Sequence, residues 1–246
     1  MNNKFLIFKV FGDWGHFKIP YTTTSPLSFP IPPKTTVTGM LGAILGLGKN
    51  EYLKYFSKRN YKLGIIINNP VKKIRIGQNL INTKTEKTKY FGRMKADKSA
   101  RTQLNIEYLK NPSYTFIIKS EYSDFYNDLK KKLSNGETVY TLYLGISECI
   151  ANYDYVGEFK GNKIKNENPV YIDSVLPVNK INNKEIYNIV DDKLELNKVH
   201  LPVKFNENRE LIKSNNFLIE KQGRPLQVMM TYYYEIENIN KNVILY

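Results

Sequence analysis

The residues able to carry acid–base or metal chemistry are few and lie far apart in the sequence. There are two histidines, His16 and His200, and neither stands beside a carboxylate pattern. The motifs of zinc peptidases, P-loop NTPases and serine hydrolases are absent. Asp191 and Asp192 form an acidic pair, but adjacent aspartates in a polar loop are typically solvated. We therefore expect no metal and no cofactor, although metal-free RNA cleavage needs only a base such as His16, Tyr21 or a lysine.

The positive charge of the chain says more about its binding partner than these candidate catalytic residues do. The 246 residues carry a net charge of +14, which favours a polyanionic partner, nucleic acid before an anionic membrane. A general lysine bias in composition is the alternative. Residues 70–110 hold eleven bases and three acids, a net +8, so the charge is concentrated in one window.

Within this window aromatic and basic side chains alternate. Aromatic rings stack on unpaired bases while cations follow phosphates, so the pattern favours a protruding β-hairpin that binds RNA. A solvated loop with incidental lysines is the alternative. The alternating residues are Lys89, Tyr90, Phe91, Arg93, Lys95 and Arg101.

The segment GDWGHFK, residues 12–18, offers a second possible contact. It places Trp14, His16 and Phe17 beside Lys18. A ring exposed here would stack on a nucleotide while Lys18 met phosphate. The alternative is that His16 or Trp14 packs this loop against a sheet.

Composition predicts a folded protein of a reducing compartment. Hydrophobic residues make up 41% of the chain and aromatic residues 13%, which is enough for a substantial core. The single cysteine, Cys149, excludes an internal disulfide and is expected to be a small buried residue. No apolar run reaches the ~18 residues of a membrane span, and the first residues do not resemble a signal peptide. We expect a cytoplasmic protein without a membrane partner.

Apolar periodicity predicts the elements that position these residues. Residues 37–45 have helical spacing after a proline-rich loop, with Thr35 or Thr36 as the expected N-cap. A second long helix should begin near Tyr122 and stop at Asn135 and Gly136. The expected apolar face of this helix is Tyr122, Phe125, Tyr126, Leu129 and Leu133. The other expected elements are a short helical turn at 51–59 and strands at 4–11, 61–67, 71–80, 113–120 and 138–145.

This order of elements predicts an α+β fold of the split βαβ, ferredoxin-like plan, which RNA-recognition motifs share. The chain is expected to form a domain at 1–150 and a β-rich C-terminal extension at 151–246. Gly39, Gly42 and Gly46 form a strip along the first helix, where each glycine costs roughly 1 kcal/mol relative to alanine. A bare strip allows close packing, either on the protein's own sheet or on a partner.

Three stretches resemble, in order, the signature of the fifth family of CRISPR-associated proteins, Cas5. They are GDWGHFKIPYTTTSPLSFPIPPKTTVTGMLGAILG, RTQLNIEYLKNPSYTFIIK and YTLYLGISECIA, which together span roughly residues 4–151. The resemblance implies a member of the repeat-associated mysterious protein (RAMP) superfamily within a type I Cascade complex. Without large helical insertions, the chain looks most like type I-B.

Such a subunit grips the 5′ handle of the CRISPR RNA (crRNA) and contacts the backbone and large subunits of Cascade. It meets target DNA through the assembled complex, in antiviral defence. A thumb hairpin projects from it, and here the thumb would fall at about residues 80–105. The resemblance and the charge pattern together imply RNA contacts by His16, Lys18, Lys34, Thr38, Arg75, Lys89, Tyr90, Phe91, Arg93, Lys95, Arg101 and Gln103.

One branch of the family, type I-C, is itself an endoribonuclease that uses a tyrosine and a lysine–histidine pair. This chain contains no lysine–histidine dipeptide. Where that pair would be sought, the sequence IIKSEYSD has Lys119 but no histidine. The expectation is therefore a non-catalytic RNA-binding subunit, and the alternative is a metal-independent enzyme that processes CRISPR repeat RNA.

Overall fold

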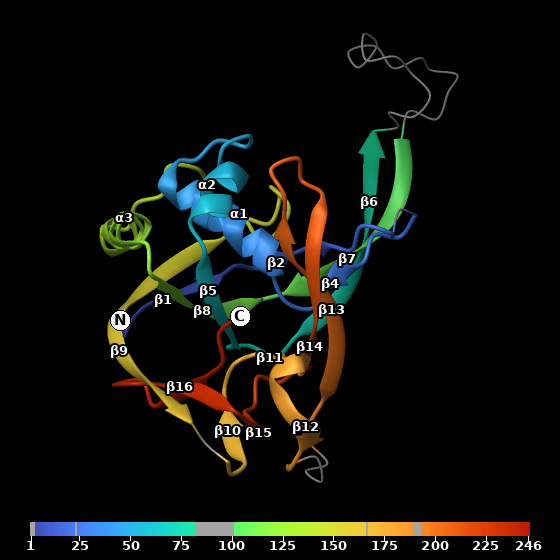
Figure 1. Ribbon diagram of the computed structural model, residues 1–246. Helices are drawn as coiled ribbons and strands as arrows, with labels where there is room; N and C mark the ends of the chain where they lie inside the picture. Colours follow the sequence, from blue (N-terminus) through green and yellow to red (C-terminus); the bar gives the residue numbers. More distant parts are fainter. Residues whose placement is uncertain (1–2, 23, 82–100, 166, 189–192) are drawn as a thin grey trace.

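The computed structural model describes residues 3–22, 24–81, 101–165, 167–188 and 193–246. In these ranges the chain forms an α+β fold made mostly of strands, with three α-helices (Figure 1). None of those helices is long and apolar enough to cross a membrane. The helices are α1 (Lys34–Leu45), α2 (Tyr52–Lys58) and α3 (Ser123–Ser134).

A six-stranded antiparallel sheet forms the centre of the fold, with the strand order β17-β16-β9-β1-β8-β5. Its two longest ladders join β1 to β9 and β5 to β8, and β1 also pairs with β8. The strands are β1 (Lys4–Phe11), β5 (Tyr61–Ile67), β8 (Ser113–Ser120), β9 (Asn152–Lys165), β16 (Tyr232–Ile236) and β17 (Lys241–Val243).

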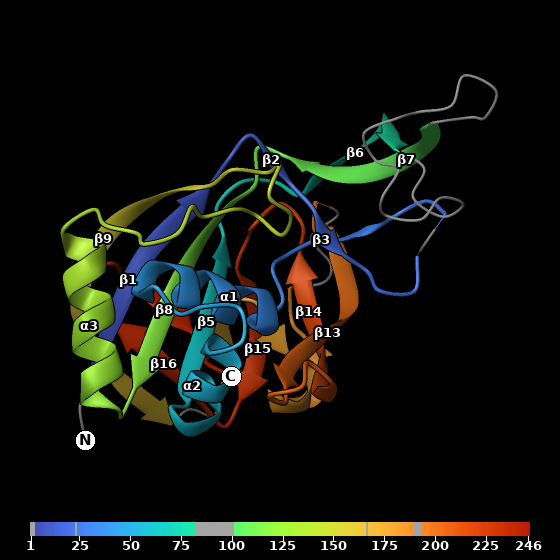
Figure 2. The ribbon, with the colours of Figure 1, turned by 90° about the horizontal axis from the view of Figure 1, so that it is seen from above.

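Strand β1 is almost continuously apolar because both of its faces are buried. Leu6 and Phe8 belong to the main core, which also contains residues of all three helices. Phe5 and Ile7 point to the other face and pack in a second cluster with Tyr234 of β16. A strand covered on both sides has no solvent face and so needs no alternating polar positions. Figure 2 shows the three helices lying over β1, β8 and β5.

Helix α3 confirms the apolar face predicted from periodicity. Phe125, Tyr126, Leu129 and Leu133 are buried, whereas Tyr122 stands at the N-cap and is exposed. The predicted stop is also confirmed, because Asn135 is the C-cap and Gly136 follows with a φ of 71°. Cys149 is buried as expected, and burial raises the pKa of its thiol to about 11.

The strand predicted at residues 138–145 is wrong. This segment is a loop with one isolated bridge, between Tyr143 and Ile150. Gly145 has a φ of 98°, a conformation that few other residues adopt, and a side chain there would collide with the carbonyl group of His16. The loop therefore crosses close over His16, whose amide donates to the carbonyl of Leu144. Strand β9 takes the place beside β1 instead.

The predicted threonine cap of α1 is also wrong. Pro33 is the N-cap, and no side chain caps the helix. Its glycines do not face the sheet either. Gly42 lies against α2, where a Cβ atom would come within 2.9 Å of the Cβ of Tyr52. Gly39 has open space beside it, and Gly46 ends the helix in the left-handed conformation.

The chain beyond residue 150 contributes β9, β16 and β17 to the central sheet, so this sheet takes strands from both sides of the expected boundary. The remaining C-terminal strands form two three-stranded sheets, β10-β15-β12 and β11-β14-β13. Hairpin β13–β14 also packs against α1. The bounds are β10 (Val170–Ile172), β11 (Leu176–Pro177), β12 (Ile181–Ile186), β13 (Leu196–Phe205), β14 (Leu211–Glu220) and β15 (Leu226–Met230), with the 3-10 helix η2 (Val178–Lys180).

Candidate nucleic-acid interface

A long hairpin of strands β6 (Lys72–Ile81) and β7 (Arg101–Lys110) projects from the body of the molecule (Figure 1). The two strands pair over their whole length, from Lys72 opposite Lys110 to Ile81 opposite Arg101. At its base β7 also pairs with the short strand β2 (Trp14–Gly15). The paired strands carry five bases and one acid. The first and last parts of the basic window, residues 72–81 and 101–110, are therefore the two paired strands of this hairpin.

The hairpin has two unlike faces, because residues opposite each other in a ladder share a face. One face is apolar. Ile106 and Tyr108 on it are buried at the base, while Ile74 and Leu80 are exposed. The other face is mostly polar and exposed along its outer part, where it carries Arg75, Asn79, Arg101, Gln103 and Asn105 together with the exposed Ile81.

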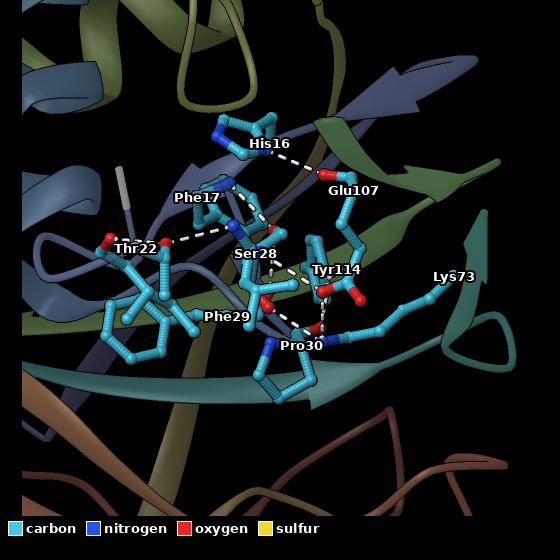
Figure 3. Close-up of polar contacts among 11 residues, drawn as sticks. His16, Phe17, Thr22, Ser28, Phe29, Pro30, Lys73, Glu107 and Tyr114 are labelled. Carbon is cyan, nitrogen blue, oxygen red and sulfur yellow. Dashed lines mark hydrogen bonds and ion pairs between the residues drawn. The ribbon is translucent and has the colours of Figure 1, made fainter. Parts of the chain in front are cut away.

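Glu107 fixes the base of the hairpin to the loop before α1 (Figure 3). Its Oε1 atom accepts from Lys73 Nζ at 2.7 Å and from the Ser28 amide at 3.1 Å. Lys73 Nζ also donates to the Ser28 carbonyl at 2.7 Å. Ser28 belongs to β4 (Ser28–Phe29), which pairs with β3 (Phe17–Lys18). The Glu107 carboxylate therefore adds a link, through β4, to the direct pairing of the GDWGHFK segment with β7.

His16 is turned into this junction. It is 2% exposed, and its Nδ1 atom lies 2.7 Å from the Glu107 carbonyl oxygen. Its ring lies 5.7 Å from the ring of Tyr108, which also contacts Trp14. In this structure His16 packs the loop against the hairpin, which was the alternative to stacking on a nucleotide. Lys18, on β3, is exposed.

Lys34 and Thr38 lie apart from the hairpin, on α1. Thr38 is buried, and its Oγ1 donates to the Lys34 carbonyl and lies 2.9 Å from the Tyr61 hydroxyl. Lys34 Nζ donates to the carbonyl oxygens of Tyr61 and Tyr246, both at 2.8 Å. Burial, followed by repulsion from four other lysines, lowers the pKa of Lys34 from 10.5 to about 7.

The twelve residues expected to bind RNA thus fall into separate groups. Arg75, Arg101 and Gln103 share the polar face of the hairpin. His16 and Lys18 lie near its base, and Lys34 and Thr38 lie on α1. Five others lie outside the described residues, namely Lys89, Tyr90, Phe91, Arg93 and Lys95, as does the acidic pair Asp191 and Asp192. The described residues contain no cluster of ligands able to hold a metal ion.

A hollow beside α1, here called the α1 hollow, was not predicted from the sequence. It has a volume of about 650 Å³ and is lined by α1, α2, the loop at residues 140–145 and the turn between β13 and β14. Arg209, in that turn, donates to the Lys49 carbonyl and lies 5.7 Å from the ring of Tyr52. None of the described lining residues carries a carboxylate. Its aromatic and cationic members are Lys49, Tyr52, Tyr140, Tyr143, Phe205 and Arg209.

The first and third of the sequence motifs meet around this region. The third motif, from Tyr140 onward, contacts the first motif at two places: the Tyr140 amide donates to the Ala43 carbonyl of α1, and Gly145 lies against His16. Residues 140–145 belong to one of the motifs, but because they were predicted to form a strand, their place in a loop that lines the hollow was missed. Arg209 lies in no motif, so nothing in the sequence could have placed it here.

Solved structures share this architecture. A chain of a "CRISPR RNA-guided surveillance complex" superimposes with a TM-score of 0.56 and 13% identity, covering 92% of this chain and 91% of that one. A CRISPR protein from Archaeoglobus fulgidus superimposes with a TM-score of 0.57 and 16% identity, covering 98% of each chain. At such identities the likeness concerns the fold alone. By its fold, this chain is similar to CRISPR-associated proteins.

The sequence places the chain more narrowly. No curated protein matches it, but the profile of the family described as "CRISPR-associated protein (Cas_Cas5)" matches residues 5–209. Because that match covers most of the sequence, the chain belongs to the Cas5 family. The family indicated by the three motifs is therefore confirmed.

Proposed function

We propose that this protein is a non-catalytic, RNA-binding subunit of a CRISPR Cascade surveillance complex and grips the 5′ handle of the crRNA. The β6–β7 hairpin is its thumb. The order β9-β1-β8-β5, with α1 and α3 in the crossovers, supports a ferredoxin-like RAMP domain. The largely β-structured C-terminal part and the absence of large helical insertions among the described residues favour type I-B.

The observation that carries this proposal is the polar face of the hairpin. Arg75, Arg101 and Gln103 share it with two asparagines, and all five are exposed. Guanidinium groups bind phosphate, and side-chain amides bind base edges or sugar hydroxyls. Glu107 is bound to Lys73 and Ser28 and so does not repel RNA from the outer part of this face.

The α1 hollow supports a second contact with the handle. It offers aromatic rings for stacking and cations for phosphate, and its described lining residues add no negative charge. The exposed apolar residues of the hairpin, such as Ile74 and Leu80, are suited to the neighbouring backbone subunit. Contact with the large subunit, and with target DNA through the assembled complex, completes the proposed role in antiviral defence.

The positions of the candidate bases support a non-catalytic role over repeat processing. His16 is in the interior, whereas Tyr21 is 82% exposed. Lys119 lies over the rings of Phe5 and Tyr234, which cluster on the face of the sheet opposite the helices. An acid and a base must both reach one 2′-hydroxyl or its leaving group, and of these three side chains only that of Tyr21 is exposed.

The hairpin is tested with two charge-matched double variants. R75E/R101E reverses two charges on the polar face, and K72E/K110E reverses two charges that lie opposite each other on the apolar face. Binding to a single-stranded 5′-handle RNA is measured by fluorescence anisotropy across a salt series. We expect R75E/R101E to lose at least about tenfold in affinity and to reduce the salt slope by roughly 1.4, which corresponds to two phosphate contacts. An equal loss in both variants would indicate a general charge effect and would refute the proposed face.

Repeat RNA incubated with the purified protein in EDTA tests the alternative function. We expect full-length RNA to persist. Cleavage at one position that is lost in Lys119→Ala would establish a metal-independent endoribonuclease, which is the alternative.

A further inference from the structure

A second pocket, here called the lysine pocket, lies on another side of α1. It has a volume of about 480 Å³. Its walls are the first turns of α1, part of α2, the start of β5, η2, the β13–β14 hairpin and the last residues of the chain. Figure 1 shows the β13–β14 hairpin standing beside α1. The pocket contains neither the β6–β7 hairpin nor the aromatic loop at residues 140–145.

The side chains that line it carry a strong excess of positive charge. Five lysines line it, and none of the other described lining side chains is acidic. A carboxylate stands nearby: Glu207 accepts a hydrogen bond from the lining residue Ser57, at 3.1 Å. The five lysines are Lys34, Lys62, Lys180, Lys204 and Lys213.

Two of these lysines are paired in an unfavourable register. Lys204 of β13 pairs with Lys213 of β14, between two irregularities in the register of the antiparallel ladder. Side chains in such a pair share one face and lie close together, and like charges there are destabilising. A hairpin under no other constraint would gain stability from an acid at one of these two positions.

Lys34 lies at the buried end of the pocket. An ammonium group has three donors. Two of them bind the main-chain oxygens of Tyr61 and Tyr246, and the group also lies 4.8 Å from the centre of the Tyr61 ring. Burial and the four neighbouring lysines lower the pKa of Lys34 to about 7, which reflects the excess of positive charge around it. An anion in the pocket would balance this excess charge and raise the pKa of Lys34.

Neutral donors complete the arrangement. Asn60, Asn179 and Asn215 line the same pocket, and their side-chain amides can donate to oxygen atoms. A compact anion with several acceptor oxygens therefore matches this site better than a single carboxylate does. A phosphate group has that shape and charge.

We propose that the lysine pocket binds a phosphate group, with Lys34 at its floor and Lys204 and Lys213 at its outer wall. The phosphate belongs either to an RNA backbone or to a free nucleotide. The site is separate from the proposed RNA grip of the β6–β7 hairpin and does not depend on it.

The test uses K204Q/K213Q, which removes the facing pair of charges and leaves Lys34 in place. The control is K160Q/K165Q, which removes two exposed lysines of β9 outside the pocket. Binding of inorganic phosphate, 5′-AMP, a uridine hexanucleotide and a hexaglutamate peptide is measured by calorimetry. Melting temperatures are recorded in buffer without phosphate.

We expect the wild-type protein and the control to bind at least one phosphate ligand, and K204Q/K213Q to bind it at least tenfold more weakly. In buffer without phosphate, K204Q/K213Q should melt at a higher temperature than wild type because the opposed charges are gone. A loss confined to the hexanucleotide identifies RNA as the source, whereas a loss for 5′-AMP identifies a nucleotide.

Equal binding of every phosphate ligand by the two double variants would overturn the proposal. Binding of hexaglutamate alone would also overturn it and would point to an acidic protein partner. R75E/R101E should retain binding of phosphate or 5′-AMP, so failure of the hairpin proposal and failure of this one give different results.

Discussion

The buried amine of Lys34 makes a quantitative prediction about stability and pH. Its pKa is lowered from 10.5 to about 7 by burial and by the lysines around it. Between these two values the unfolded chain holds a proton that the folded chain has released. Stability therefore rises with pH in this window. Below pH 7 both states are protonated, and the contribution of Lys34 no longer changes.

The size of the effect follows from the same shift. One pKa unit corresponds to about 1.4 kcal/mol, and Lys34 is half titrated at pH 7. From pH 7 to pH 8.5 the free energy of unfolding should gain roughly 1.6 kcal/mol from Lys34 alone. For a domain of this size that gain raises the melting temperature by about 3–6 °C. Above pH 8.5 the buried thiol of Cys149, whose pKa is raised to about 11, contributes in the opposite direction.

The assay compares wild type with Lys34→Met by urea unfolding at several pH values in buffer free of phosphate. Methionine keeps the apolar stem and removes the titrating amine. We expect the rise between pH 7 and pH 8.5 in wild type to be absent in the variant. Lys54→Met, which removes an exposed lysine of α2, should keep the rise.

NMR of the Lys34 side chain gives a direct check, with a titration midpoint near 7 expected for the folded protein. Parallel stability curves for wild type and Lys34→Met, together with a midpoint near 10.5, would refute the reasoning. Saturating phosphate should raise the midpoint if the lysine pocket binds it.

Four further variants test the packing of α1 and the base of the hairpin. Gly42→Leu should lower the free energy of unfolding by about 1–3 kcal/mol, measured by thermal melting, because its Cβ would lie 2.9 Å from the Cβ of Tyr52. Gly39→Leu has open space and should leave melting unchanged or raise it, while it fills the α1 hollow and weakens handle binding; unchanged binding would exclude the hollow from the interface. Glu107→Ala should cost about 1–3 kcal/mol in urea unfolding because it leaves the Ser28 amide without its acceptor, and Glu107→Gln should recover part of that loss.

Local sequence patterns were sufficient to predict elements whose buried residues follow from the element's own geometry. The helical face of α3 could be predicted because burial there repeats with the period of the helix, and β1 because a strand buried on both faces is a continuous apolar run. The concentration of charge in residues 70–110 likewise predicted the hairpin, whose described strands β6 and β7 flank residues 82–100. The family was evident from three ordered motifs, and the profile match confirms it.

Residues 138–145 show where local patterns fail. Their alternation of apolar and polar residues favours a strand, but Gly145 takes a positive φ so that the loop can pass over His16. That contact joins residues more than a hundred positions apart, and the preference of a short segment cannot encode it. The expected strand position beside β1 is consequently filled by β9.

The sequence by itself determined the basic character of the protein, its apolar strands and helices, and its family, because these depend on composition and short-range order. Only the tertiary structure decided which charges share a site. Lys34 and Lys213 lie far apart in the chain, and the docking of β13–β14 against α1 brings both to the lysine pocket. The expected RNA-binding residues were separated in the same way, between the hairpin and α1. Packing between segments that are far apart in the sequence sets these distances, and a local repeat of apolar residues carries no information about it.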